Sequence, residues 1–452
     1  MYKLAFLLFL PFFSNGQVIS TFAGCGTMCT GVGDGGPATV AVVNDPIGGT
    51  FDKYGNYYFA EGLGKRVRKI DTAHIITTIA GTGSSSVLGD GGQATAAGLP
   101  SPNAVKLDTF GNLYLLDGNN RVRKVVAVTG IISTIVGDGT GALLGDGGPA
   151  TAAELYGPSD ICFDKKGNLY IADGFNYRIR KVNAMGIIST FAGNGFAALG
   201  SGDGGPATAA KFSLPTGIIA DDIGNIYIAD ESANTVRKVD TFGNIITVAG
   251  NTLPLYTGDG IPATNAQISP IKVAIDSSGN LIIGDRYNER VFRVDHAGII
   301  HSIAGIGGSG SYSGDGGPAT AASFDVGGVS FDPCWNLYIS DINNRRIRKV
   351  TNNPTCNPHS HIHFDSSSLM ANTLTSRDIN IYPNPANTSI TIQATYKISQ
   401  ITITSLLGQI FYTQKYNMGE VEVNIAGLPE GVYIVKVTDN EGKVTVNKIL
   451  KE

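Results

Sequence analysis

The sequence predicts an all-β protein, a six-bladed β-propeller followed by a small C-terminal β-sandwich. The first observation behind this prediction is a Gly-Asp-Gly-Gly motif, or a near copy, that occurs six times. Its aspartates are Asp34, Asp90, Asp146, Asp203, Asp259 and Asp315, which are 56, 56, 57, 56 and 56 residues apart. This period is longer than the roughly 20 to 47 residues of solenoid repeats and suits one propeller blade per repeat.

The second observation is that each repeat holds four short apolar segments. In the third repeat they are residues 159–164, 168–173, 178–182 and 187–193. They are rich in Ile, Val, Tyr and Phe and are separated by Gly and Asn, and no stretch shows a sustained helical period. Four such strands in antiparallel order form the meander of a propeller blade.

The third observation concerns the two ends of the repeated region. The fourth-strand pattern occurs six times, but its first copy, residues 18–24, precedes any complete repeat, and the last repeat ends at Val350 without one. We therefore expect residues 18–24 to pair beside residues 346–350 as the outer strand of the sixth blade. A ring closed in this way has no long unpaired strand edge at its seam.

The composition indicates a folded protein. Of the 452 residues 42% are apolar, only 15% are charged and 60 are glycine, whereas an average soluble protein has about 25% charged residues. The net charge of −4 lacks the basic excess of a dedicated nucleic-acid binder, so we expect no nucleic-acid partner.

Residues 1–16 read as a secretory signal peptide. A lysine is followed by the apolar run Leu4 to Phe13 and then by small residues before Gln17. This run is well short of the ~20 residues that span a bilayer, and no later segment is long and apolar enough. We expect a mature chain without a transmembrane segment, outside the cytoplasm, where disulfides persist.

The repeat also carries a recognisable signature. Residues 167–173 read Gly-Asn-Leu-Tyr-Ile-Ala-Asp and are followed by Asn176 and by Arg-Ile-Arg-Lys-Val at 178–182, with Gly-Asp-Gly-Gly-Pro-Ala-Thr-Ala-Ala between copies. Over residues 17–350 the chain resembles the NHL-repeat propellers of secreted bacterial proteins. The resemblance implies the fold but no activity, because propellers support many functions.

Charged residues recur at fixed places in the blades. The third strands hold 16 of the 33 basic residues, which would suit an acidic polymer. Each blade also holds acids such as Asp164 and Asp173, and we expect these to pair with the arginines.

In the Gly-Asp-Gly-Gly loops a single acid is a poor calcium site, because calcium takes about six to eight oxygens. We expect instead positive-φ glycines and one helical turn with proline at its first position.

The five cysteines are too few for a disulfide scaffold. Cys334, in the first turn of blade six, is expected to share a face with the end of the third strand and to bridge to Cys356. Cys25 and Cys29 are a local pair within one loop. Cys162, between Ile161 and Phe163 in a strand, is expected to stay a buried free thiol.

Residues 351–376 read as a polar linker after the propeller. They contain His359, His361 and His363 at alternate positions, which would place three possible metal ligands on one side of an extended chain. A solvated linker is the favoured interpretation, and the sequence leaves metal binding here and by the glycine-rich loops open. No cofactor is predicted.

Residues 377–452 show a different β pattern, with Tyr-Pro-Asn-Pro at 382–385, Leu-Leu-Gly-Gln at 406–409 and Gly-Val-Tyr-Ile-Val-Lys-Val at 431–437. In this order the motifs resemble the type A C-terminal sorting domain of the type IX secretion system. The resemblance implies that the type IX machinery is a partner. It also implies passage through the periplasm to the cell surface of the outer membrane or to the medium.

The expected function is binding of a protein or a glycan by an exported propeller. In each blade the second-to-third connection and the loop to the next blade emerge on one face. Side chains that depart from the repeat there are the candidate binding residues: Phe175, Tyr177, Arg286, Tyr287 and Glu61. The alternatives are a propeller enzyme, either a lyase or a glycan-active hydrolase, and a purely structural adhesion protein. No common catalytic motif appears.

Overall fold

The computed structural model describes residues 17–26, 31–85, 89–308, 310–352, 379–383, 386–405, 410–429, 431–441 and 444–451. The chain divides into two compact units, Met1–Ile362 and His363–Glu452. The first holds the six repeats and the second holds the C-terminal β pattern. The predicted signal peptide and nearly all of the predicted linker lie outside the described residues.

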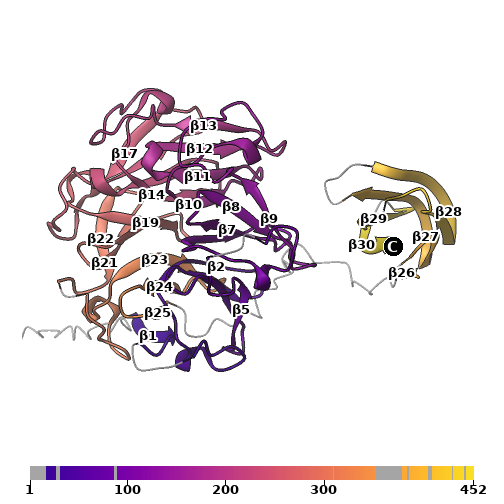
Figure 1. The fold of residues 1–452 in the computed structure, drawn as a ribbon, viewed down its shortest axis with the longest axis horizontal. Helices are drawn as coiled ribbons and strands as arrows, with labels where there is room; N and C mark the ends of the chain where they lie inside the picture. The colour runs from indigo at the N-terminus through magenta and orange to yellow at the C-terminus, as the bar shows by residue number, and fades with distance from the viewer. Residues whose placement is uncertain are drawn as a thin grey trace, which may run out of the picture. The chain divides into compact units, whose positions relative to one another are not determined.

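The six repeats form six antiparallel sheets, the blades of a propeller (Figure 1). Blade 1 is β2 (Pro46–Phe51), β3 (Tyr57–Glu61), β4 (Arg66–Ile70) and β5 (Ile76–Ala80); blade 2 is β6 (Ala104–Leu107), β7 (Leu113–Asp117), β8 (Arg121–Val125) and β9 (Ile132–Val136); blade 3 is β10 (Pro158–Phe163), β11 (Leu169–Asp173), β12 (Arg178–Val182) and β13 (Ile188–Ala192). Blade 4 is β14 (Pro215–Ala220), β15 (Ile226–Asp230), β16 (Thr235–Val239) and β17 (Ile245–Ala249); blade 5 is β19 (Pro270–Ile275), β20 (Leu281–Asp285), β21 (Arg290–Val294) and β22 (Ile299–Ala304); blade 6 is β23 (Val326–Phe331), β24 (Leu337–Asp341), β25 (Arg346–Thr351) and β1 (Val18–Ala23).

The first strand of each blade lies next to the axis. β2, β6, β10, β14, β19 and β23 contact one another in sequence around the ring, and β23 contacts β2. Figure 1 shows β2, β10, β14, β19 and β23 near the middle of the propeller and β5, β9, β13, β17, β22 and β1 toward its outside. The apolar core fills the space between successive blades: Phe212, from the segment that leads into blade 4, is fully buried between residues of blades 3 and 4.

The ring closes through its first strand, as the sequence predicts. β1 pairs antiparallel with β25, with Ile19 opposite Val350 and Thr21 opposite Arg348. Ile19 is fully buried. The chain's first described strand therefore completes the sixth blade.

Each Gly-Asp-Gly-Gly segment covers the outer edge of a blade. Pro149 forms a β-bridge with Ile187 at the start of β13, and in blade 5 the same segment forms the two-residue strand β18 (Ile261–Pro262) on β22. Its neighbour Ala150 donates to the Gly186 carbonyl in blade 3 and accepts from the Gly137 amide after blade 2. The segment thus protects an edge and fastens two blades together.

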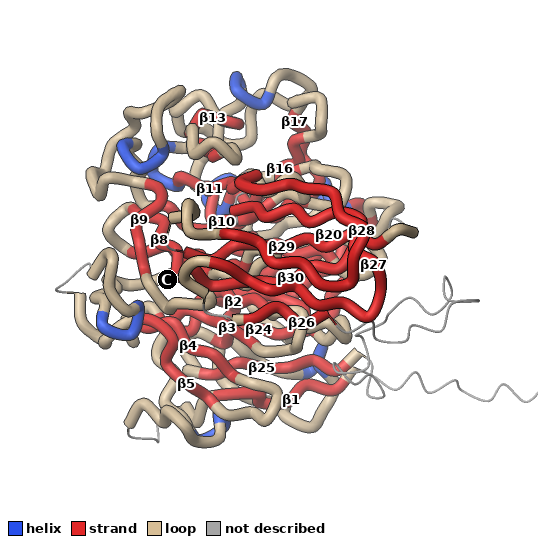
Figure 2. The backbone as a smooth tube through the Cα atoms, turned by 90° about the vertical axis from the view of Figure 1, so that its right-hand side faces the viewer, coloured by secondary structure: helices blue, strands red, loops and turns tan. Residues whose placement is uncertain are grey.

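The predicted helical turn is present as a three-residue 3₁₀ helix in each of these segments, such as η3 (Ala150–Ala152). Proline is not its first residue, however. Pro149 is the N-cap with φ −60° and ψ 132°, because its extended backbone still belongs to the β-bridge. In the described part of the chain helices are only short 3₁₀ segments among strands and loops (Figure 2).

The second unit is one curled five-stranded sheet. Its strands are β26 (Ile379–Tyr382), β27 (Ser389–Ser405), β28 (Ile410–Asn424), β29 (Gly431–Asp439) and β30 (Val444–Lys451). The first half of β27 pairs with β26, its second half pairs with β29, and the register shifts between Gln393 and Ile398. Ile392 and Ile403, from the two halves, share one buried cluster. The predicted sandwich therefore takes the form of one sheet that folds over itself, because β27 and β28 run through both layers.

Candidate functional site

A buried arginine in the third strand joins two carboxylates. In blade 3 the Arg180 side chain is fully buried, donates from Nη2 to Asp146 at 2.7 Å and lies 3.4 Å from Asp173 through Nη1. Asp173 is also fully buried. The predicted pairing of Asp173 is confirmed, and the aspartate of the Gly-Asp-Gly-Gly loop already has a cationic partner.

The same arrangement recurs around the ring. The equivalent sets are Arg68 with Asp34 and Glu61, Arg123 with Asp90 and Asp117, Arg237 with Asp203, and Arg348 with Asp315 and Asp341. Blade 5 has Phe292 at the arginine position. There the Tyr256 ring stacks on Phe292 at 5.1 Å, and the Tyr256 hydroxyl bonds to Asp259.

Burial divides the acids of this network into two classes. It raises the pKa of Asp173 to about 6 and that of Glu61 to about 7, although an arginine lowers both. Partial burial also acts to raise the pKa of Asp146, but hydrogen bonds from Thr190 and Arg180 hold it below its usual value. The loop aspartate is therefore the ionised partner of the arginine.

Asp164 does not pair with arginine, so that prediction is wrong. It lies after β10, and its Oδ1 accepts from the amides of Lys166 and Asn168 at 2.9 Å each. Its Oδ2 accepts from the Asn168 side chain at 2.7 Å and from the Tyr170 hydroxyl at 3.2 Å. Asp164 therefore shapes the tight turn into β11, which precedes the arginine strand.

The connections between second and third strands end in a left-handed residue. Tyr177 has φ 53°, and the equivalent Asn120, Asn234 and Arg345 lie between 54° and 60°. Gly193, at φ +89°, follows β13 beside this residue, and a Cβ there would collide with the Tyr177 carbonyl. Tyr177 itself is half-buried against the core between blades 3 and 4. Packing within the fold therefore accounts for the tyrosine at position 177, and no ligand is needed to explain it.

Arg286 lies where four blades meet at the axis. It follows β20 in blade 5, and its Nε lies 3.7 Å from Oδ1 of Asp325, which precedes β23 in blade 6. It also attracts Asp45, before β2 in blade 1, and Glu231, after β15 in blade 4. Blades 1 and 4 are opposite each other in a six-membered ring, so these groups surround the axial mouth.

The carboxylates at this mouth are short of positive charge. Burial raises the pKa of Asp45, Glu231 and Asp325, and the attraction of Arg286 lowers each only in part. Glu289 and Asp45 raise the pKa of Asp325 further. Arg286 therefore acts on all three carboxylates, while Lys272 also lowers the pKa of Glu231 and Asn343 donates to Asp325. A carboxylate has about four lone-pair sites, so acceptor capacity for a ligand remains.

A buried ion pair links the inner strands of blades 3 and 5. Lys272 in β19 reaches past blade 4 to Asp160 in β10 at 3.2 Å and donates to the Ser159 and Thr216 carbonyls at 2.9 and 3.1 Å. Burial lowers the pKa of Lys272. Both residues line a cavity of about 10 Å³ between the inner strands.

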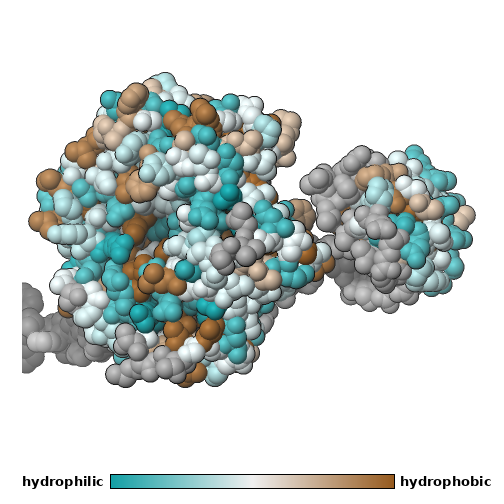
Figure 3. All heavy atoms as spheres, viewed as in Figure 1, coloured by the Kyte–Doolittle hydropathy of each residue, from teal (hydrophilic) through white to brown (hydrophobic). Residues whose placement is uncertain are grey.

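Exposed side chains alternate in character around the mouth. The second residue after each β3-type strand is exposed and apolar in blades 1, 3 and 5, and exposed and polar in blades 2, 4 and 6. These residues are Leu63, Phe175 and Tyr287, and Asn119, Ser232 and Asn343 respectively. Leu63, Phe175 and Tyr287 are 72%, 52% and 66% exposed. On the face that Figure 3 presents, apolar side chains form separate groups among hydrophilic ones.

The predicted binding residues therefore do not share one environment. Phe175 and Tyr287 are exposed on the predicted face, and Arg286 lies at the mouth. Tyr177 is half-buried against the core. Glu61 is only 2% exposed and pairs with Arg68 at 3.2 Å, so it is the counterpart of the second-strand aspartates in other blades and not an exposed binding residue.

The sequence interpretation missed Asp45, Glu231 and Asp325. Glu231 was visible as a departure from the repeat, because Gly62, Gly118 and Gly174 occupy its position in three other blades. Asp45 and Asp325 lie in segments that lead into a first strand and differ in length among repeats. Asp45 and Asp325 come close together only because closure of the ring places blade 1 next to blade 6.

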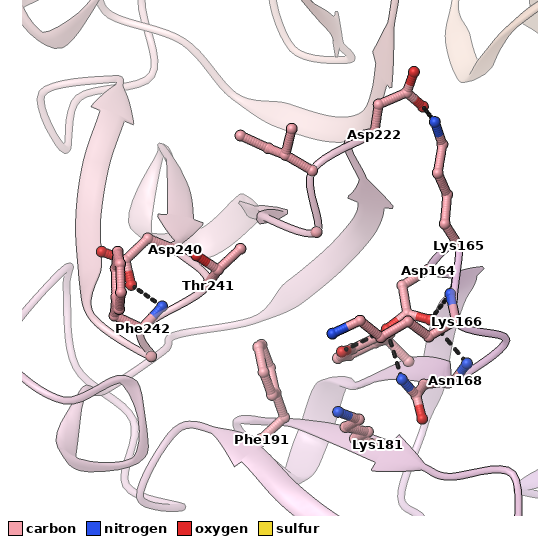
Figure 4. Close-up of a pocket in the computed structure, with 14 residues that line it drawn as sticks. Asp164, Lys165, Lys166, Asn168, Lys181, Phe191, Asp222, Asp240, Thr241 and Phe242 are labelled. Atoms are coloured by element: carbon pink, nitrogen blue, oxygen red, sulfur yellow. Dashed lines mark hydrogen bonds and ion pairs between the residues drawn. The ribbon is translucent and has the colours of Figure 1, made fainter.

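A second hollow lies between blades 3 and 4, on the opposite face, where the first-to-second and third-to-fourth turns emerge (Figure 4). Its volume is about 380 Å³. Lys166 and Lys181 line it together with Phe191 and Phe242, and Lys165 bridges to Asp222 at 3.1 Å across its rim. We call this hollow the inter-blade groove.

The remaining titratable groups form no metal centre among the residues described: nowhere in these ranges do three His, Cys, Asp or Glu side chains gather to hold an ion. The structure also tests the predictions for the cysteines. Cys25 and Cys334 are each disulfide-bonded. Their predicted partners Cys29 and Cys356 lie outside the described residues, as do His359, His361 and His363. Cys162 is buried and free, as predicted. No described helix has the length and apolarity to cross a membrane.

Two family descriptions match parts of the chain. Residues 380–452 match the secretion system C-terminal sorting domain, and residues 140–200 match the teneurin NHL domain. The chain is 27% identical over 252 residues to Protein SUPPRESSOR OF QUENCHING 1, chloroplastic, of Arabidopsis thaliana, covering 53% of this chain and 24% of that protein. It is 30% identical over 293 residues to Teneurin-4 of Homo sapiens, covering 55% and 10%. The chain thus spans less than a quarter of either relative.

Solved structures share the propeller. A protein of unknown function from Bacteroides thetaiotaomicron superposes with a TM-score of 0.55 at 18% identity, covering 74% of this chain and 75% of that one. An auxiliary nutrient binding protein from the same organism gives 0.54 at 16% identity, covering 74% and 76%. At such identities the likeness concerns the fold alone. Together with the repeats, the ring of blades and the two matched segments, it leads to one assignment: the chain is an NHL-type β-propeller with a type IX secretion system C-terminal sorting domain.

Proposed function

We propose that this protein is a glycan-binding propeller that the type IX machinery exports through the periplasm to the outer-membrane surface or the medium. The sorting domain supports the destination. The axial mouth supports the binding role, because Arg286 there attracts carboxylates from three other blades.

The chemistry of the mouth suits a neutral sugar. Carboxylates with spare lone pairs accept hydrogen bonds from sugar hydroxyls, and the half-exposed Arg286 guanidinium donates. Tyr287 and Phe175 offer exposed aromatic faces on which the C–H face of a sugar ring can pack. A structural neighbour described as an auxiliary nutrient binding protein has the same fold, so this fold is compatible with a binding role.

The test is a binding screen of the mature full-length chain against neutral oligosaccharides, followed by calorimetry on any ligand found. Arg286→Ala and Tyr287→Ala should each weaken binding about tenfold or more. Phe110→Ala is the matched control, because Phe110 is a 69% exposed aromatic residue on the opposite face of blade 2. A ligand whose affinity is unchanged in both mouth variants would contradict the proposal, and so would a screen without any saccharide ligand.

A further inference from the structure

We propose that the inter-blade groove between blades 3 and 4 is a second binding site, which takes a ligand with a carboxylate on a six-membered ring. The site is independent of the axial mouth, since it lies on the opposite face. Its volume of about 380 Å³ is within the range of small-molecule sites, about 300 to 1,000 Å³.

Lys165 and Asp222 pair with each other in the groove, whereas Asp164 and Asp240 accept hydrogen bonds within their own turns. The lining contains three lysines and three aspartates, so its formal charges balance. Asp164 accepts from Asn168, Tyr170 and two backbone amides. Asp240 accepts from the amides of its own turn at 2.9 and 2.8 Å, which hold its pKa below the usual value.

Two of the lysine side chains that line the groove make fewer interactions. Within the described part of the chain the Lys166 side chain makes no ion pair or hydrogen bond, and the Lys181 ammonium group stands over the Tyr170 ring, 5.4 Å from its centroid. Figure 4 shows Lys166, Lys181 and Phe191 around the same space. Two ammonium groups that line one hollow are suitable donors for a carboxylate, because charge-assisted hydrogen bonds are the stronger ones.

The apolar part of the groove supplies a surface for a ring. Phe191 is half-buried and packs edge-on against Tyr170 at 4.9 Å, so its orientation is fixed. Phe242, at the rim, is 88% exposed. A large aromatic residue left in water beside a lined hollow is the feature that a ring-bearing ligand would cover.

The groove is specific to this pair of blades. Blade 3 has two lysines in its first turn, at 165 and 166, whereas the equivalent pairs are Lys53-Tyr54, Thr109-Phe110, Asp222-Ile223, Ser277-Ser278 and Pro333-Cys334. Phe242 is likewise the only aromatic residue at its turn position. Lys181, by contrast, repeats in other blades, where lysines stand over the equivalent tyrosines. The lining thus combines Lys181, which recurs in other blades, with the lysine pair and Phe242, which occur only here in the repeats.

The experiment measures affinity by calorimetry on the mature full-length chain with three probes. Trigalacturonate is a carboxylated sugar, benzoate is a carboxylated aromatic ring, and galactotriose is the neutral counterpart of the first. We expect one of the two acids to bind and galactotriose not to bind in the groove. Which acid binds identifies the source of the ligand. Failure of both acids at millimolar concentration overturns the proposal.

Two exposed substitutions of opposite sign locate the binding. Lys166→Gln should weaken affinity for the acid about fivefold or more. Asp222→Asn should tighten it about twofold, because it removes a negative charge and frees Lys165 from a pair whose side chains are 66% and 88% exposed. Neither change endangers folding.

Lys53→Gln, in the equivalent turn of blade 1, is the control and should leave the affinity unchanged. Tyr287→Ala should also leave it unchanged, which separates this site from the axial mouth. Equal affinities in wild type and Lys166→Gln, or an effect of Tyr287→Ala as large as that of Lys166→Gln, would overturn the assignment.

Discussion

At the scale of single residues, the arginine of the third strand is the most constrained charge in the propeller. Five blades bury it completely between carboxylates. Blade 5 has no arginine at this position and instead places Phe292 there, stacked on Tyr256. The comparison indicates that either an ion pair or an aromatic pair can fill this position. Replacement of the arginine alone would leave its buried carboxylate partner unpaired, so both residues would have to be replaced together.

Arg180→Met should therefore lower the free energy of unfolding by about 3 to 5 kcal/mol, because it leaves the buried Asp173 without its cation. Urea-induced unfolding of the mature chain measures the change. Lys165→Met, at a position 66% exposed, should change stability by less than about 0.5 kcal/mol. A loss in Arg180→Met no larger than in this control would show that the pair does not stabilise the fold.

The buried acids predict a pH dependence of stability. The pKa of Glu61 is raised by burial from 4.5 to about 7, and those of Asp173, Asp230 and Asp341 from 3.8 to about 6. The folded state then binds more protons than the unfolded state in this window, so stability should fall as pH rises from about 4 to about 7. Melting temperatures across this range measure the trend, and Glu61→Gln should flatten its upper part. A melting temperature that rises over the same window would contradict these shifts.

The sequence could predict that acids and arginines pair but not which acids. Asp146, Asp164 and Asp173 all recur once per repeat, so periodicity alone does not distinguish them. Asp164 is used by its own turn because the amides two and four residues ahead lie within reach. Asp146 pairs with an arginine 34 residues away, and only the packed blade shows this.

At the scale of elements, strands were predictable and the outer cover of each blade was not. The strand segments follow from β-branched and aromatic runs between turn residues. The bridge from Pro149 to Ile187 joins two segments with three strands of blade 3 between them, and two residues are too few for a strand pattern. The mouth residues likewise belong to connections, where the repeat is least regular.

The seam strand provides the prediction at this scale. Deletion of residues 17–24 should lower the melting temperature by about 10 °C or more, because it exposes the edge of β25 and the apolar face that Ile19 covers. Ile19→Ser is a milder variant that should lower it in the same direction, since Ile19 is fully buried. Val18→Ser, at a 44% exposed neighbour, is the control. Unchanged melting of Ile19→Ser would show that β1 is not needed for closure.

At the scale of the whole molecule, the chain consists of a propeller unit and a sorting-domain unit with separate cores. We expect the boundary to lie within the predicted linker 351–376. The two units therefore lend themselves to separation by truncation.

A chain that ends at Ser376, produced in a host with the type IX system, should accumulate in the periplasm and remain folded. Cell fractionation and surface proteolysis measure its location, and thermal melting measures its fold. Normal amounts at the cell surface would contradict the role of residues 377–452. Loss of the melting transition would instead contradict the boundary. The full-length chain in the same host is the control.

The pairing of β1 with β25 has a further consequence for the order of folding. Val18 pairs with Thr351, so the sixth blade joins segments separated by nearly the whole propeller sequence. Pairs so distant along the chain carry the largest loop-closure entropy and form late. The first strand to leave the ribosome must wait, unpaired, for the last repeat. The blades therefore form an open row until the last repeat is available, and only its pairing with β1 closes the ring.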